Sequence, residues 1–223
     1  IYSFSHCIED AIALARWTRE EVAKAYDIDP KNIFLAGHSN GGNTVLNAAR
    51  YLPFLRGVIA FCPYDHQAGL EHIPHQDLKT AFEEAAAVLH VGRFEDLWQD
   101  SVEHASEWSF TANAHRFQDR NLLLIGGRRD TVAPPEWMIE PLWQELEAMP
   151  TQSHHKKSDC WIPTTAWTSP SGAHPDHGPM DPGSRGRLIP GIKKECRAHC
   201  AALFFSIHSF RTTALLCSGS LAP

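Results

Sequence analysis

The sequence predicts an α/β fold in which a parallel sheet is flanked by helices. Three short apolar runs, at 33–36, 58–61 and 121–125, are typical of buried parallel strands, because such strands are apolar on both faces. Stretches with helical spacing separate these runs, and strands that alternate with helices form parallel sheets through right-handed crossovers. The length of 223 residues suits one sizeable domain.

Composition excludes several classes of protein. Hydrophobic residues make up 43% and charged residues 21% of the chain, values that rule out collagen, a coiled-coil rod and a wholly disordered chain. No apolar run is long enough for a membrane span. The net charge of -6 gives no basic field to attract nucleic acid. We therefore expect neither a nucleic-acid partner nor a membrane span.

The first element is expected to be a helix from about Cys7 to Ala25, because its apolar positions are spaced to form one buried face. The helix must end before Pro30, since the residue that precedes a proline avoids helical angles. The apolar run 33–36 then predicts the first strand.

The run GHSNGG at 37–42 joins this strand to a predicted helix over 43–51. A strand, a tight turn and a helix in this order project a serine hydroxyl above the sheet edge, so Ser39 is the candidate nucleophile. Gly37 and Gly41 are expected to leave room beside the strained turn. The backbone N–H of Asn40 is the candidate donor to a developing oxyanion, helped by the positive end of the helix.

The remaining elements repeat the alternation. Strand 58–61 is followed by Asp65, a mostly helical region spans about 78–108, and strand 121–125 is followed by Asp130 before a final helix over about 137–148. Chemistry in open parallel sheets gathers at the carboxyl ends of the strands. A nucleophilic serine needs a histidine, and the histidine needs an acid to orient it. Asp130 is the candidate acid, with Asp65 as its rival.

These motifs resemble a known family. Residues 7–150 look like the C-terminal half of an α/β-hydrolase, closest to prolyl-oligopeptidase-like peptidases and dienelactone-hydrolase-like esterases. The resemblance rests on Glu9-Asp10, the stretch 26–30, GHSNGG at 37–42 and GGRRDTVAPP at 126–135. It implies that Ser39 is the nucleophile and Asp130 the acid, in the chain order Ser, Asp, His. It implies an ester or peptide substrate and no cofactor.

Two features depart from the family. The chain begins one helix before Ser39, so we expect the family's earlier strands and the second oxyanion donor to be missing, and strand 33–36 to be uncovered on one side. The histidine is also displaced. His208, in His208-Ser209-Phe210, matches the family's motif, whereas His154 and His155 match its spacing from the acid. His208 is the preferred base, with His154 or His155 as one alternative and a chain in which none of these histidines is catalytic as the other.

Residues 151–223 differ in character from the acidic segment 1–150. They are basic, and 161–190 is rich in Pro, Gly, Ser and His without helical or strand periodicity. We therefore divide the chain into a partial hydrolase domain, 1–150, and an atypical segment, 151–223. Our hypothesis is that about 156–206 is an insertion or the product of a frame change, and that 207–223 resumes the hydrolase end if it is an insertion.

Three functional hypotheses follow. The first is a serine hydrolase that cleaves an ester or peptide bond. The second is a catalytically inactive, hydrolase-like binding or scaffold protein, and the third is a non-functional or alternative product of a hydrolase gene. A weaker pattern could be read as zinc ligands, but it lacks paired CxxC spacing, so no metal site is predicted. Its members are Cys196, His199, Cys200, His174, Asp176 and His177.

Overall fold

The computed structural model describes residues 1–87, 89–151, 153–160, 201–205 and 213–216. Its six strands form one sheet in the order β4-β3-β2-β1-β5-β6. All neighbouring strands are parallel except β5 and β6, which are antiparallel. In chain order the strands are β1 (Ile33–His38), β2 (Gly57–Phe61), β3 (Leu122–Gly127), β4 (His155–Cys160), β5 (Ala201–Phe205) and β6 (Thr213–Leu216).

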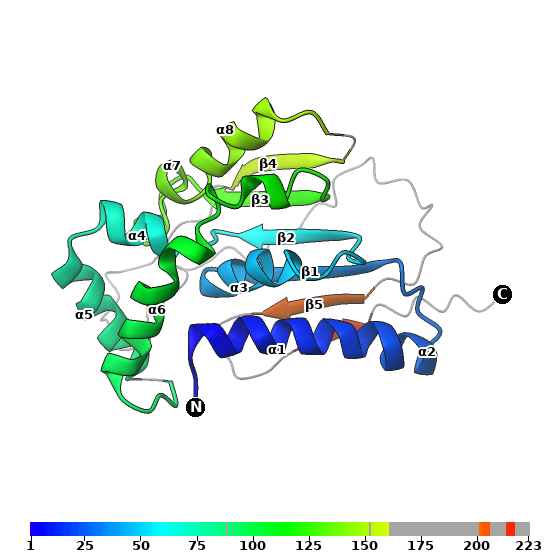
Figure 1. The fold of residues 1–223 in the computed structure, drawn as a ribbon, viewed down its shortest axis with the longest axis horizontal. Helices are drawn as coiled ribbons and strands as arrows, with labels where there is room; N and C mark the ends of the chain where they lie inside the picture. Colours follow the sequence, from blue (N-terminus) through cyan, green and yellow to red (C-terminus); the bar gives the residue numbers. More distant parts are fainter. Residues whose placement is uncertain (88, 152, 161–200, 206–212, 217–223) are drawn as a thin grey trace, which may run out of the picture.

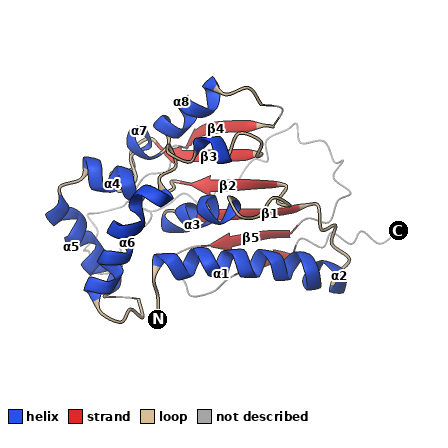
Figure 2. Ribbon diagram, viewed as in Figure 1, coloured by secondary structure: helices blue, strands red, loops and turns tan. Residues whose placement is uncertain are grey.

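Helices cover the sheet and extend beyond its carboxyl edge. Figure 1 shows α1 and α3 lying along the strands, while α4, α5 and α6 gather past the arrowheads. Figure 2 shows the same division between strands and helices. In chain order the helices are α1 (Phe4–Trp17), a π-helical turn (Thr18–Val22), α2 (Ala23–Ala25), α3 (Asn40–Ala49), α4 (His66–His72), α5 (His75–Ala86), α6 (Phe94–Trp108), a 3-10 turn (Ala114–Arg116), α7 (Pro135–Met138) and α8 (Glu140–Ala148).

Helix α1 begins at Phe4, three residues before the predicted start, and has the predicted buried face except at Trp17, which is exposed. It buries Phe4, Ile8, Ala11 and Ala15, whose spacing places them on one face. The Ser3 side chain caps the helix by accepting a hydrogen bond from the His6 amide at 3.1 Å. The helical path continues through the π-helical turn into α2 and ends before Pro30, as expected.

One face of the central strands is fully buried, whereas the residues that alternate with it, such as Ile59 of β2 and Leu123 of β3, are partly exposed. Ile33 and Leu35 of β1 and Leu124 of β3 are fully buried. β1 pairs with β2 so that His38 lies opposite Phe61, and β2 pairs with β3 so that Phe61 lies opposite Ile125. The carboxyl ends of β1, β2 and β3 therefore meet at one edge of the sheet.

The expectation that β1 would be uncovered on one side is wrong. β5 pairs with β1 in parallel over 33–37 and 201–205, on the side away from β2. This pairing supplies partners for backbone N–H and C=O groups that an open edge would leave exposed. β4, β5 and β6 all lie after residue 150, so the sheet draws strands from both sides of the predicted division, which itself stays a prediction.

Candidate active site

Ser39 occupies a strained turn between β1 and α3. Its backbone angles are φ 56° and ψ −122°, a conformation that costs a non-glycine residue on the order of 1–3 kcal/mol. Three backbone hydrogen bonds hold it: the Ser39 N–H donates to Phe61 O at 2.9 Å, and Ser39 O accepts from the amides of Tyr64 at 3.1 Å and Asn43 at 3.2 Å. The neighbouring strand β2 and the loop that follows it therefore stabilise the turn.

Glycine is required two residues before Ser39. A Cβ built on Gly37 would lie 2.0 Å from the carbonyl oxygen of Gly41 and 2.8 Å from the amide nitrogen of Gly42. Atoms cannot approach so closely, so the chain entering the turn and the first turn of α3 pack together only because residue 37 lacks a side chain. Gly37 and Gly41, both singled out from the sequence, therefore meet across the turn.

Asn40 is the first residue of α3 and is buried, with 6% of the residue exposed. The first amides of a helix have no partner within the helix, and the helix dipole gives this end a partial positive charge. Among the described residues, none accepts a hydrogen bond from the Asn40 amide. The amide is thus a suitable donor to an anion that forms beside Ser39.

Asp130 lies at the same edge of the sheet as Ser39. It follows the carboxyl end of β3, and β2 is the only strand between β3 and β1. Two strand spacings place the ends of β1 and β3 about 10 Å apart. Oδ1 of Asp130 accepts hydrogen bonds from the amides of Val132 and Ala133, each at 2.9 Å. These bonds fix the orientation of the carboxylate.

Asp65, the rival acid, has a structural role. It caps α4 through Oδ1, which accepts from the amides of Gln67 at 2.9 Å and Ala68 at 3.2 Å. Oδ2 accepts from the Phe110 amide at 2.7 Å. Burial raises the pKa of Asp65 to about 6, although these three hydrogen bonds act to lower it. Both carboxylate oxygens are therefore occupied by backbone donors, which favours Asp130 as the acid.

The candidate histidines do not gather around Ser39 in the described residues. His208 lies outside the residues that the structure describes. His155 begins β4 and pairs with Leu122, the first residue of β3, so it lies at the amino edge of the sheet. The length of a six-residue strand, about 17–20 Å, separates that edge from the carboxyl edge. His154 precedes His155, so neither alternative can reach Ser39.

His66 is a buried histidine that the sequence reasoning did not single out. It is the first residue of α4 and is 1% exposed. Its Nε2 lies 3.0 Å from Asn40 Oδ1 and its Nδ1 lies 2.6 Å from Ser101 Oγ. Burial lowers its pKa to about 3, so the ring is neutral at physiological pH. Only its position after a strand end and next to Asp65 could have drawn attention to it.

The described residues include no group of three His, Cys, Asp or Glu side chains that could hold a metal ion. The weak zinc pattern around Cys196 and Cys200 lies outside them. In the same part of the chain, none of the helices has the length and apolar character needed to cross a bilayer.

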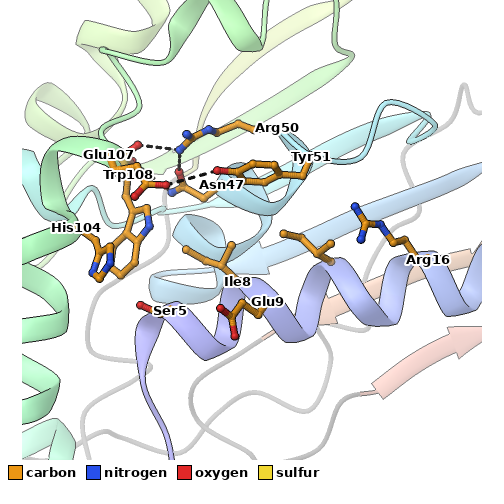
Figure 3. Close-up of a pocket in the computed structure, with 11 residues that line it drawn as sticks. Ser5, Ile8, Glu9, Arg16, Asn47, Arg50, Tyr51, His104, Glu107 and Trp108 are labelled. Atoms are coloured by element: carbon orange, nitrogen blue, oxygen red, sulfur yellow. Dashed lines mark hydrogen bonds between the residues drawn. The ribbon is translucent and has the colours of Figure 1, made fainter.

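A cavity of about 410 Å³ lies between α1, the end of α3 and the end of α6. Figure 3 shows its lining, in which His104 stacks on Trp108 and Arg50 donates to Asn47 Oδ1 and to the Glu107 carbonyl oxygen, each at 2.7 Å. The cavity adjoins Asn47 and Arg50 at the carboxyl end of α3, whereas Ser39 precedes its amino end. The ten residues of α3 span about 15 Å, so the cavity is separate from the Ser39 site.

Comparison with models of protein families identifies the fold family of this chain. A family model described as alpha/beta hydrolase fold matches residues 2–150. The chain belongs to the α/β-hydrolase fold family. The match begins two residues before α1 and ends two residues after α8, so it includes Ser39, Asn40 and Asp130. The resemblance inferred from the sequence is thus confirmed at the level of the family and its fold.

Several solved structures are similar to part of this chain at low sequence identity. A puromycin hydrolase is 18% identical over 68% of this chain and 21% of its own, with a TM-score of 0.49. A Mycobacterium tuberculosis puromycin-hydrolyzing peptidase is 23% identical over 69% of this chain and 21% of its own, with a TM-score of 0.44. Acetyl xylan esterase 1 from Thermoanaerobacterium sp. JW/SL YS485 is 18% identical over 68% of this chain and 44% of its own, with a TM-score of 0.45.

This chain therefore spans about a fifth of the length of the puromycin hydrolase and of the puromycin-hydrolyzing peptidase. A search of curated proteins found no match.

Proposed function

We propose that this α/β-hydrolase is a serine hydrolase that cleaves a carboxylic ester or a peptide bond. The observation that carries the proposal is the strained backbone of Ser39, with φ 56° and ψ −122°, at the carboxyl end of β1. Such strain persists only where the surrounding structure enforces it, and it is typical of functional turns. Membership of the family and the position of Asp130 at the same edge support the proposal.

The proposed reaction uses Ser39 as the nucleophile. Its Oγ attacks the substrate carbonyl carbon while its proton passes to a histidine, and the carbonyl electron pair moves onto oxygen, where the Asn40 amide stabilises the charge. The tetrahedral intermediate then expels an alcohol or an amine, which takes the proton from the histidine. Water hydrolyses the resulting ester of Ser39 by the same steps. Asp130 orients the histidine by accepting a hydrogen bond from its other ring nitrogen.

The base in this proposal is His208, the histidine that matches the family's motif. His154 and His155 are poor candidates, because β4 begins with His155 at the opposite edge of the sheet from Ser39. No metal or organic cofactor takes part in the proposed steps.

A hydrolase-like binding or scaffold protein is the second candidate function. It is favoured by one observation, namely that His154 and His155, which have the family's spacing from Asp130, lie at the amino edge of the sheet. A protein without a base beside Ser39 would keep the fold and lose the nucleophile's activation.

Labelling with an alkyl fluorophosphonate tests the two candidates. In this reaction a serine oxygen bonds to phosphorus, fluoride leaves, and the serine proton goes to the base. We expect the wild-type chain to label and the Ser39→Ala variant not to label, with the same circular dichroism spectrum for both. His208→Ala should also abolish labelling, whereas His154→Ala and His155→Ala should retain it. A folded wild-type chain that does not label would support the binding protein instead.

A further inference from the structure

We infer that His66 is a positioning residue of the proposed active site, which holds the Asn40 amide in place through the Asn40 side chain. This inference rests on the proposed function, because the Asn40 amide matters only if an oxyanion forms beside Ser39. A chain of hydrogen bonds joins four separate parts of the fold and places His66 behind Asn40.

The chain runs from α6 to the N-terminal segment. Ser101 on α6 lies 2.6 Å from Nδ1 of His66 on α4, and Nε2 of His66 lies 3.0 Å from Oδ1 of Asn40 on α3. Nδ2 of Asn40 then donates to the hydroxyl of Tyr2 at 3.0 Å. Both Oδ1 and Nδ2 of Asn40 are therefore hydrogen-bonded, and these two bonds fix the rotation of its side-chain amide.

The direction of each proton follows from the chemistry of the groups. The Asn40 oxygen can only accept, so Nε2 of His66 must carry the proton. A neutral imidazole has one donor and one acceptor, so Nδ1 of His66 accepts and the Ser101 hydroxyl donates. Burial lowers the pKa of His66 and raises that of Tyr2, so both groups stay in the states that this chain requires.

Aromatic rings fix the imidazole of His66 in its place. Its centroid lies 4.6 Å from that of Phe4, 5.4 Å from that of Tyr64 and 5.4 Å from that of Trp108. His66 is 1% exposed and Ser101 is 1% exposed, so water does not compete for their hydrogen bonds. The histidine is a rigid donor aimed at Asn40.

The position of Asn40 explains why such a donor would matter. Asn40 directly follows Ser39 and opens α3, where the first helical amides lack partners and helices fray. An oxyanion donor has to be placed within a few tenths of an ångström, and residues behind the first contacts provide that placement. Through Asn40, His66 resists relaxation of the strained Ser39 turn.

Two variants of His66 that differ by one methylene group test the inference. The side-chain amide nitrogen of His66→Gln can take the place of Nε2 and donate to Asn40, whereas that of His66→Asn reaches only the place of Nδ1. With an alkyl fluorophosphonate, we expect the maximal labelling rate of His66→Asn to fall about 10-fold to 100-fold, less than deletion of an oxyanion donor itself would cause. The apparent affinity for the probe should change less than threefold. His66→Gln should stay within about threefold of wild type.

The matched control is His104, which lies on α6, stacks on Trp108 and lines the separate cavity. His104→Asn should leave the labelling rate unchanged. If His66→Asn labels at the wild-type rate, or if His66→Gln loses as much as His66→Asn while both remain folded, the inference is wrong. Should His66→Asn fail to fold, Ser101→Ala replaces it, with Ser109→Ala as control; equal labelling rates for these two would likewise overturn the inference.

NMR of the same proteins separates this inference from the proposed function. The ring nitrogen shifts of His66 in wild type should show the proton on Nε2, and a proton on Nδ1 would refute the chain of hydrogen bonds. The chemical shift of the Asn40 backbone amide should differ from that of wild type in His66→Asn and should remain close to it in His66→Gln. If the wild type does not label but these shifts appear, the proposed function fails while the link from His66 to Asn40 stands.

Discussion

The backbone of Gly37 faces the carbonyl group of Gly41, so that a Cβ at residue 37 would lie 2.0 Å from the Gly41 oxygen. The end of β1 and the first turn of α3 therefore pack with no space for a methyl group. The contact fixes the sharp reversal that presents Ser39 at the edge of the sheet.

Gly37→Ala should accordingly destabilise the protein by more than about 3 kcal/mol, since the clash is with backbone atoms that cannot move aside. Urea unfolding followed by circular dichroism would measure the loss. Gly92→Ala is the matched control, because a Cβ at Gly92 would have no neighbour closer than 3.7 Å and residue 92 is exposed. Equal unfolding midpoints for the two variants would contradict the packing described here.

The two acids at strand ends should respond differently to replacement. Asp65→Ala removes the acceptor of three backbone amides, one of them on Phe110 in a distant loop, and should cost about 2–4 kcal/mol. Within the described part of the chain, Asp130→Ala removes the acceptor of the amides of Val132 and Ala133, and this loss should cost about 1 kcal/mol.

Labelling by a fluorophosphonate should show the opposite order. Asp130→Ala should reduce the labelling rate at least about 100-fold, because an unoriented histidine is a poor base. The folded fraction of Asp65→Ala should label at close to the wild-type rate. Loss of labelling in folded Asp65→Ala, with retention in Asp130→Ala, would reassign the acid.

Local patterns in the sequence were sufficient to predict the central part of the fold. The apolar run 33–36 and the glycines of 37–42 specify a buried strand and a tight turn, and the structure has β1 and the strained Ser39 there. The family match confirms the fold class. The roles of Ser39, Asn40 and Asp130 in catalysis remain predictions.

Features that depend on distant contacts could not be predicted. Asp65 and Asp130 look equivalent in the sequence, because both follow apolar strands. Asp65 differs in the structure through its burial and its hydrogen bond from the Phe110 amide, 45 residues away in the chain. His66 likewise gains its partners Asn40 and Ser101 from other elements. The pairing of β5 with β1 joins segments separated by more than 150 residues, and no local periodicity encodes it.

The adjacent groups Asp65 and His66 predict how stability depends on pH. Burial raises the pKa of Asp65 from 3.8 to about 6, so the folded state holds an extra proton between about pH 4 and 6, and this contribution to stability is lost as pH rises. Burial lowers the pKa of His66 from 6.5 to about 3, so its contribution is lost as pH falls below about 6.5. Between pH 4 and 6 the contributions of Asp65 and His66 to the free energy of unfolding therefore change in opposite directions as pH rises.

His66→Gln removes the pH-dependent contribution of His66 to the free energy of unfolding. Relative to wild type, its free energy of unfolding should therefore decrease as pH rises from 4 to 6, by up to about 1.4 kcal/mol per pH unit. Urea unfolding at half-unit intervals would measure this difference. Parallel curves for variant and wild type would show that His66 takes up a proton equally in both states, contrary to its burial.

Asp100 on α6 anchors the start of α1. Its Oδ2 accepts hydrogen bonds from the amides of Phe4 at 2.8 Å and Ser5 at 3.0 Å, and its side chain is 13% exposed. Asp100→Ala should lower the free energy of unfolding by about 2 kcal/mol and speed hydrogen exchange at these amides, because helix-terminal donors lose a charged acceptor. Asp96→Ala on the same helix removes an exposed ion pair with Arg93 and should cost at most about 1 kcal/mol. Equal losses, with exchange at Phe4 and Ser5 unchanged in Asp100→Ala, would mean that α1 is held by its apolar face alone.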